Sequence, residues 1–190
     1  MTVKAIIFDC FGVLAQGSLT GFYDRHFGDD ETARREAYDL EQASSRGMIT
    51  HEQWLAELAD LAQIQVAQAE SELTNNPPNE NLFNYIAAKL KPDFKIGFLS
   101  NAADDFREEL FTPEQLKLFD DFVISYRVRL AKPDVRIYEL AAERLGLLPG
   151  ECVFVDDIER YCAAAEDAGM QSIWYRSFKQ FEHGMHKLLH

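Results

Sequence analysis

The sequence has few cysteines, few prolines and no long apolar run. Its 190 residues include only three cysteines, Cys10, Cys152 and Cys162, and six prolines. An odd, unclustered set of cysteines argues against a disulfide framework and indicates free thiols in a reducing compartment. No apolar run has the length of a transmembrane helix, and the apolar stretch near the N-terminus is too short for a signal peptide. We therefore expect a cytoplasmic protein that does not enter a membrane.

Positive charge is also scarce. There are 19 Lys and Arg residues against 32 Asp and Glu, which gives a net charge of −13 at pH 7. This acidity argues against nonspecific binding of nucleic acid and against adhesion to anionic lipid. It does not exclude a small phosphorylated molecule, whose site needs only local positive charge. The length fits one domain with a modest insertion, present as a monomer or a homodimer.

Five short apolar runs predict β-strands, at residues 4–9, 95–100, 120–125, 152–157 and 171–175. Most of these runs are apolar throughout rather than alternating, as expected for strands that are covered on both faces. Helix-like segments separate the later runs, and one of them, residues 135–146, ends at a glycine. Such an alternation of strands and helices predicts an α/β fold with a doubly wound parallel sheet.

The interval between the first two predicted strands is far longer than an ordinary crossover. Within it, residues 51–73 carry apolar side chains at helical spacing, and Thr50 is a candidate N-cap. Residues 74–82 are rich in Asn and Pro and indicate a return linker. We therefore expect a core domain of residues 1–14 and 93–190, with a helical cap of residues 15–92 inserted after the first strand.

Polar side chains follow three of the predicted strands. They are Asp9 after the first strand, Ser100 and Asn101 after the second, and Asp156 and Asp157 after the fourth. Taken singly, most of these residues have an ordinary explanation as caps of turns or helices. Ligands of open parallel sheets, however, bind outside the carboxyl ends of the strands. The order and spacing of these residues therefore predict one common site.

Three carboxylates at one site repel one another unless a positive charge neutralises them. Lys132, which precedes the predicted helix at residues 135–146, offers one such charge. A hard divalent cation with oxygen ligands offers another, and Mg²⁺ both retains water and bridges to phosphate. The residues therefore predict a site whose carboxylates are neutralised by Lys132 or by a cation, for which Mg²⁺ is suited.

Four segments resemble, in the same order, the four motifs of the haloacid dehalogenase (HAD) superfamily. They are IIFDCFGVL, GFLSNA, KPDVRIY and FVDD, and the inserted helices resemble the type-1 cap of the phosphatase-like branch. The resemblance covers nearly the whole chain, and four motifs in order are far more specific than any one. It implies a Rossmann-like HAD core and a Mg²⁺-dependent phosphatase that acts on a small phosphorylated metabolite.

The resemblance also implies a role for each site residue. Asp9 would be the nucleophile that forms an aspartyl-phosphate, and Lys132 would be its charge partner. Ser100 and Asn101 would bind the transferring phosphoryl group, and Gly12 would let the chain turn beneath it. The metal ligands would be Asp9, the backbone carbonyl of Phe11, and the pair Asp156 and Asp157.

Two positions depart from the family pattern. Phe11 stands where most phosphatases of the family have a second Asp, which protonates the leaving oxygen and later activates water. Loss of such an acid and base typically costs a factor of about 10²–10⁴ in rate. Tyr161 stands where the fourth motif has Asn, which predicts a looser fourth motif.

These departures leave two alternative functions open. In 2-haloacid dehalogenases of the superfamily, the residue two after the nucleophile is often aromatic, as Phe11 is, and the reaction needs no metal. That subgroup, however, replaces the acidic pair by small polar residues, whereas this chain keeps Asp156 and Asp157. The other alternative is a catalytically impaired phosphate-binding or regulatory protein that has lost turnover because Phe11 replaces the acid.

Overall fold

The computed structural model of the chain describes residues 2–189. Its elements are β1 (Ala5–Phe8), α1 (Leu19–His26), α2 (Glu31–Ser45), α3 (His51–Leu61), α4 (Val66–Leu73), α5 (Glu80–Tyr85), the π-helix η1 (Ile86–Leu90), β2 (Lys95–Ser100), α6 (Arg107–Leu110), α7 (Pro113–Leu116), β3 (Asp121–Ile124), α8 (Ser125–Val128), α9 (Val135–Arg144), the 3-10 helix η2 (Pro149–Glu151), β4 (Cys152–Asp156), α10 (Glu159–Asp167), β5 (Gln171–Trp174) and α11 (Phe178–Leu189). Among the described residues, no helix combines the length and the apolar character needed to cross a membrane.

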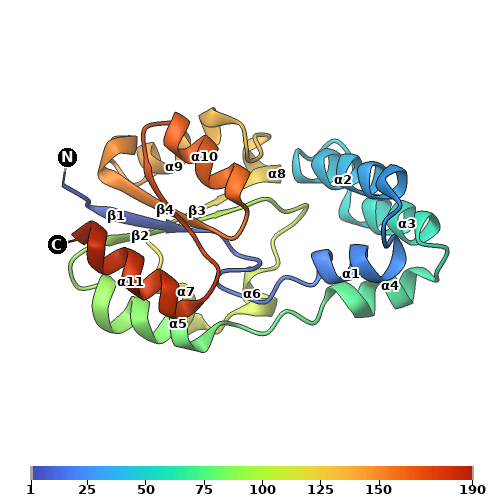
Figure 1. Cartoon of the computed structure of the whole chain (residues 1–190), viewed down its shortest axis with the longest axis horizontal. Helices are drawn as coiled ribbons and strands as arrows, with labels where there is room; N and C mark the ends of the chain where they lie inside the picture. Colours follow the sequence, from blue (N-terminus) through green and yellow to red (C-terminus); the bar gives the residue numbers. More distant parts are fainter. Residues whose placement is uncertain (1, 190) are drawn as a thin grey trace.

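The five strands form one parallel sheet in the order β3-β2-β1-β4-β5 (Figure 1). This confirms the five predicted strands and the doubly wound α/β fold. Every residue of β1 and of β4 is buried, because helices cover both faces of the sheet. In register, Phe8 at the end of β1 pairs with Phe98 on one side and with Val155 on the other. Asp9 therefore emerges in the middle of the sheet's carboxyl edge.

The two faces of the sheet carry separate apolar clusters. Helices α9 and α10 cover one face, where the rings of Tyr138 and Phe154 meet edge to face. Helices α5, η1 and α11 cover the opposite face, where the ring of Phe8 contacts that of Phe181. Burial of these apolar side chains on both faces is the main force that holds the sheet and its helices together.

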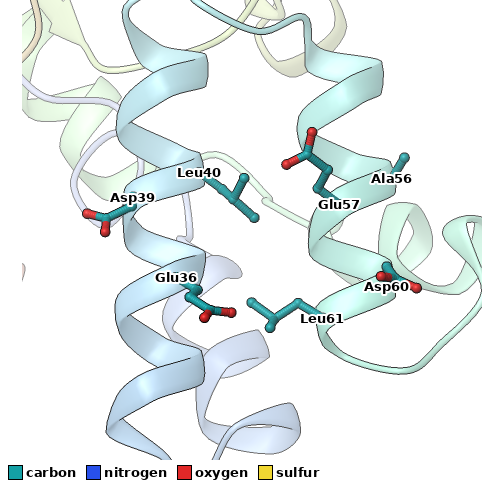
Figure 2. Close-up of a pocket in the computed structure, with 7 residues that line it drawn as sticks. All are labelled: Glu36, Asp39, Leu40, Ala56, Glu57, Asp60 and Leu61. Carbon is teal, nitrogen blue, oxygen red and sulfur yellow. The ribbon is translucent and has the colours of Figure 1, made fainter.

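Helices α1 to α4 form a separate unit beside the sheet (Figure 1). They have an apolar cluster of their own, which includes Phe22, Leu58 and Ala69. The side chain of Thr50 accepts a hydrogen bond from the backbone N–H of Gln53, which confirms the predicted N-cap of α3. Figure 2 shows α2 and α3 side by side; the groove between them is lined by Glu36, Asp39, Leu40, Ala56, Glu57, Asp60 and Leu61.

Two linkers join this helical unit to the sheet. Ala15 on the outgoing linker forms an antiparallel bridge with Pro78 on the return linker. The backbone N–H of Asn79 donates to the carbonyl oxygen of Leu14 at 2.8 Å. Paired backbone segments fix each other's direction, so the two linkers together hold the helices over the carboxyl edge of the sheet.

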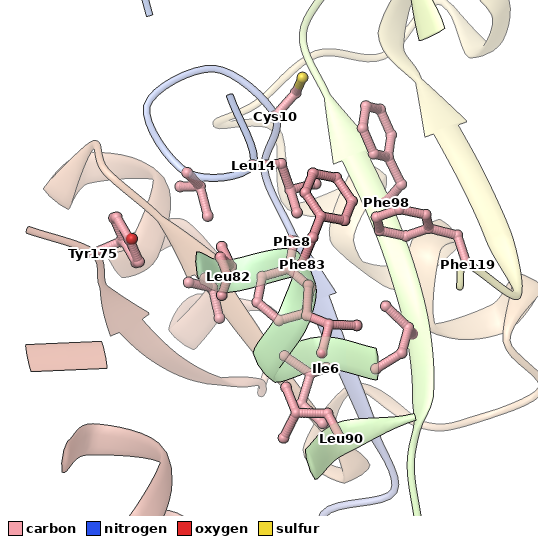
Figure 3. Close-up of a cluster of buried hydrophobic side chains, with 14 of the residues drawn as sticks. Ile6, Phe8, Cys10, Leu14, Leu82, Phe83, Leu90, Phe98, Phe119 and Tyr175 are labelled. Carbon is pink, nitrogen blue, oxygen red and sulfur yellow. The ribbon is translucent and has the colours of Figure 1, made fainter. Parts of the chain in front are cut away.

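Helix α5 and the π-helix η1 pack on the sheet rather than on the helical unit. Their buried residues Leu82, Phe83, Ile86 and Leu90 belong to the cluster around Phe8, Phe98 and Phe119 (Figure 3). The predicted boundary at residue 92 remains a prediction. The apolar packing favours a cap that ends earlier, in the return linker before α5.

Candidate active site

Asp9 lies at the point where β1 leaves the sheet. Its backbone N–H donates to the carbonyl oxygen of Val155 at 2.9 Å, so β1 and β4 remain paired up to this residue. Only 6% of Asp9 is exposed. A buried carboxylate needs a positive charge or hydrogen-bond donors close to it. The partner in this structure is Lys132.

Lys132 lies between two carboxylates. Its Nζ is 2.7 Å from Oδ1 of Asp9 and 2.6 Å from Oδ2 of Asp156, and the residue is 1% exposed. Burial acts to lower the pKa of Lys132, but the carboxylates of Asp156 and Asp9 outweigh it and raise the pKa well above the usual value for lysine. Lys132 therefore keeps its positive charge beside Asp9 at neutral pH.

Asn101 holds the main chain of Lys132 in place. Its Oδ1 accepts a hydrogen bond from the Lys132 N–H at 2.8 Å, and its Nδ2 donates to the Lys132 carbonyl oxygen at 3.0 Å. Both polar ends of the side chain are thus used for positioning, a function that the sequence did not suggest. The neighbouring Ser100 is 1% exposed, with its hydroxyl 3.4 Å from the Asn101 carbonyl oxygen. Phosphoryl binding by Ser100 and Asn101 remains a prediction.

The two adjacent acids have different surroundings. Asp156 is fully buried, and its oxygens are used by Lys132 and by the backbone N–H of Ile158, which donates to Oδ1 at 2.8 Å. Asp157 has a buried Oδ1 with no hydrogen-bond partner among the described residues. Burial and the Asp9 carboxylate raise the pKa of Asp157 to about 6. Asp157 is thus the carboxylate that still needs a cation.

The three carboxylates suit a divalent cation. Asp9, Asp156 and Asp157 each offer an oxygen, and these oxygens lie within 4.8 Å of one another. Oδ1 of Asp157 is buried and has no hydrogen-bond partner among the described residues. Hard divalent cations bind oxygen ligands, so a bound cation would give this oxygen a partner. Because Lys132 and Ile158 occupy the oxygens of Asp156, Asp9 and Asp157 are the better direct ligands. The backbone carbonyl of Phe11 remains a predicted ligand.

Gly12 makes room for Asp157. The φ angle of Gly12 is +90°, and a Cβ at this position would lie 2.2 Å from Oδ2 of Asp157. The sequence predicted that Gly12 lets the chain turn beneath a phosphate. The structure adds a second reason for this glycine, because any side chain here would displace the carboxylate that lacks a partner.

We expect Gly12→Ala to lower the free energy of unfolding by more than the roughly 1–3 kcal/mol that a strained backbone costs alone. The alanine must also push Asp157 away. Gly28→Ala is the matched control, because Gly28 also has a positive φ, of +50°, but nothing lies within 4 Å of an added Cβ. Thermal unfolding compares the two variants. Equal losses would show that the contact with Asp157 has no cost.

Phe11 and Tyr161, the two residues that depart from the family pattern, both make contacts through their aromatic rings. The ring of Phe11 contacts that of Phe106, tilted by 42° with 4.8 Å between centroids, and packs against the apolar cluster of the sheet. The ring of Tyr161 is buried and lies 4.9 Å from Nζ of Lys132. Phe11 therefore brings no titratable group to the site, whereas Tyr161 contacts the charged lysine through its ring.

The cap reaches the site through residues that the sequence analysis did not identify. The guanidinium of Arg160 lies 4.7 Å from the ring of Tyr38, on cap helix α2, and 5.0 Å from the ring of Tyr161. Glu41, three residues after Tyr38, interacts electrostatically with Arg160, Lys132 and Asp9. No motif marks these residues, because only the packing of the cap against α10 brings them to the site.

Comparison with known proteins identifies the family of the chain. Residues 3–169 match the haloacid dehalogenase-like hydrolase family. The chain is 27% identical over 207 residues to bifunctional epoxide hydrolase 2 of Sus scrofa, covering 93% of this chain and 37% of that protein. It is 27% identical over 194 residues to phosphatase MT3486 of Mycobacterium tuberculosis, covering 90% of this chain and 87% of that protein. The chain spans less than half the length of several other curated relatives.

Solved structures share the fold. A HAD family enzyme of Bacteroides thetaiotaomicron has a TM-score of 0.75 at 19% identity, covering 97% of this chain and 99% of that one. Its complex with magnesium and inorganic phosphate has a TM-score of 0.68 at 21% identity, covering 95% and 98%. At such identities the likeness concerns the fold alone. The match over residues 3–169, however, includes every site residue from Asp9 to Asp157, and the chain thus belongs to the haloacid dehalogenase-like hydrolase family.

Proposed function

We propose that this protein is a Mg²⁺-dependent phosphatase that acts on a small phosphorylated metabolite through an aspartyl-phosphate at Asp9. The observation that carries the proposal is the buried Lys132, which is bound to Asp9 and Asp156 while Asp157 keeps an unpartnered oxygen. This arrangement suits a nucleophile with a fixed countercharge and a free carboxylate for the metal. The relatives add support, since one is named a phosphatase and one solved structure holds magnesium and phosphate.

Each residue of the site would have a distinct part in the reaction. An oxygen of Asp9 attacks phosphorus, while Lys132 stays charged and stabilises the negative charge that builds up. Ser100 and the backbone near Gly12 would hold the phosphoryl oxygens, and Asn101 keeps Lys132 in position. Bound Mg²⁺, held by Asp9, the carbonyl of Phe11 and Asp157, with Asp156 close by, would neutralise charge on the phosphoryl group. The cap would exclude water during the first step.

A metal-dependent screen tests this proposal. Phosphate release is measured for a panel of phosphoesters with and without Mg²⁺, together with halide release from short 2-haloacids. We expect phosphate release only with Mg²⁺, and calorimetric binding of Mg²⁺ that is lost in Asp157→Asn. Halide release without metal would instead indicate a dehalogenase. Binding of Mg²⁺ and phosphate with no turnover of any ester would favour a phosphate-binding or regulatory protein.

We further propose that the protein is cytoplasmic, is a monomer or a homodimer, and binds neither nucleic acid nor membranes. The net charge of −13 supports the last point, since it opposes contact with anionic surfaces. The three cysteines are free, as predicted, and are also buried; free thiols suit a reducing compartment.

A further inference from the structure

The proposed reaction lacks a proton donor in the core. When an alkyl phosphate is cleaved, the departing oxygen is a poor leaving group unless it receives a proton. Phe11 cannot provide one, and its ring is packed against Phe106. Asp9 is committed as the nucleophile and Lys132 is held by two carboxylates. The donor therefore has to come from another element, and the cap is the element that lies opposite the site.

One contact between the cap and the core is centred on Arg160. Arg160 at the start of α10 lies between the ring of Tyr38 on α2 and the ring of Tyr161, which in turn lies against Lys132. Helix α2 also packs against α8 of the core. Residues three apart in a helix share a face, so Glu41 lies on the same face of α2 as Tyr38. Because Tyr38 contacts Arg160 of the core, this face of α2 is the one that meets the core.

Glu41 is electrostatically connected to the reacting groups. Its carboxyl interacts with Arg160, with Lys132 and with the nucleophile Asp9. Its other neighbours at the interface are aromatic hydroxyls, of Tyr23 on α1 and Tyr161 on α10. A salt bridge between Glu41 and a basic residue would tie up the carboxyl, and within the described residues no such pair occurs at 4.0 Å or less. The carboxyl therefore remains free to act on a substrate.

We propose that Glu41 of the cap is the general acid and base of this enzyme, in place of the acid that is absent at position 11. The inference rests on the proposed phosphatase function and adds to it a residue from outside the four motifs. It means that the site is complete only when the cap lies over the sheet, because α2 carries the proton and β1 carries the nucleophile.

The two chemical steps balance with this assignment. An oxygen of Asp9 forms a bond to phosphorus as the bond from phosphorus to the leaving oxygen breaks, and the proton of Glu41 passes to that oxygen, which departs as an alcohol. Water then attacks the aspartyl-phosphate, the bond from phosphorus to Asp9 breaks, and one proton of the water returns to Glu41. The products are an alcohol and inorganic phosphate, with both side chains restored.

The surroundings of Glu41 support a proton on its carboxyl. Burial raises the pKa of Glu41 to about 7, against the opposing effect of the nearby positive charges. The charged and titratable groups around it are Tyr23, Tyr38, Arg160, Tyr161, Lys132 and Asp9. A carboxyl with an ordinary pKa would be ionised at neutral pH and unable to donate. General acids work best when their pKa lies near the working pH.

Glu41→Gln in the full chain tests this assignment with two substrates, glycerol phosphate and p-nitrophenyl phosphate. The first has a poor leaving group and the second a good one. We expect kcat/KM for glycerol phosphate to fall by about 10²–10⁴-fold, and that for p-nitrophenyl phosphate by much less. The wild-type activity on glycerol phosphate should decline as the pH rises through the pKa of Glu41, and the variant should lack this decline.

Two further variants separate catalysis from structure. Glu36→Gln removes one charge from the same helix. Glu36 lines the groove between α2 and α3 (Figure 2), so this substitution should leave both activities unchanged. Glu41→Asp keeps the acid with a shorter side chain and should retain part of the glycerol phosphate activity. Thermal unfolding checks that every variant folds.

The outcomes distinguish the inference from the function on which it rests. A selective loss on the poor leaving group supports the role of Glu41. If the wild type is active and Glu41→Gln loses the same activity on both substrates, or loses none, the role of Glu41 is overturned and the phosphatase proposal stands. Equal losses on both substrates would be expected if Glu41 only held the cap in place through Arg160. A wild type inert towards both esters with Mg²⁺ present overturns the phosphatase proposal and, with it, the role of Glu41.

Discussion

Lys132→Met is expected to abolish activity and to destabilise the protein by about 3–5 kcal/mol, the usual cost of removing one partner from a buried ion pair. The lysine is 1% exposed and contacts Asp9 and Asp156, so its loss leaves two buried carboxylates with Asp157 close by and no positive charge between them. Since single domains are stable by only about 5–15 kcal/mol, this is a large share of the total.

The loss of stability in Lys132→Met should depend on pH. Without the lysine, burial and mutual repulsion raise the pKa values of the carboxylates in the folded state above those in the unfolded chain. Groups whose pKa is raised on folding destabilise most above that pKa. The deficit should therefore be largest at pH 8 and above and should shrink as the pH falls, because the pKa of Asp156 is raised to about 8 and that of Asp157 to about 6 even with the lysine present. Thermal unfolding from pH 5 to pH 8 measures this.

Lys91→Met is the matched control for Lys132→Met. Lys91 also contacts a carboxylate, with its Nζ 2.7 Å from Oδ1 of Asp120, but its side chain is 30% exposed. Ion pairs that remain in contact with water are worth about 0–1 kcal/mol. A loss in Lys132→Met no larger than that in Lys91→Met would contradict the central electrostatic role of Lys132.

Asp9→Asn is expected to reduce turnover by at least about 10⁴-fold while the fold is kept, as is typical when a hydrolase loses its nucleophile. An amide oxygen cannot form the aspartyl-phosphate. The Asn side chain has the same shape as that of Asp, however, and its amide oxygen can still accept the hydrogen bond from Lys132. The change also removes one negative charge next to Asp157, whose pKa Asp9 helps to raise. We therefore expect little or no loss of thermal stability.

Steady-state phosphate release and acid-quench trapping of a labelled phosphoenzyme measure the effect of Asp9→Asn. Asp93→Asn, an exposed aspartate in the turn before β2, is the control for the loss of one charge. A folded Asp9→Asn variant that turns over at the wild-type rate, or still traps labelled phosphate covalently, would show that another residue is the nucleophile. It would leave Asp9 with an electrostatic role beside Lys132.

Much of the fold could be predicted from the amino-acid pattern. Strands buried on both faces must be apolar throughout, and that requirement leaves runs such as residues 152–157 visible in the sequence. The same logic located Asp9 and Asp157, because a charge that directly follows a buried strand can lie only at its end. The boundary of the cap was less visible, since the apolar residues of α5 and η1 fit a helix on the cap as well as a helix on the sheet.

The sequence by itself determined the strands, the helical insertion, and the set of carboxylates and one lysine that share a sheet edge, because local periodicity and chain order carry that information. Only the tertiary structure decided how those charges are divided. It assigned Lys132 to Asp9 and Asp156, left an oxygen of Asp157 without a partner, and used Asn101 to position Lys132. It also brought α2 of the cap, which carries Tyr38 and Glu41, into contact with Arg160 of the core. Contacts between residues distant in the chain depend on how whole elements pack, and no local pattern encodes them.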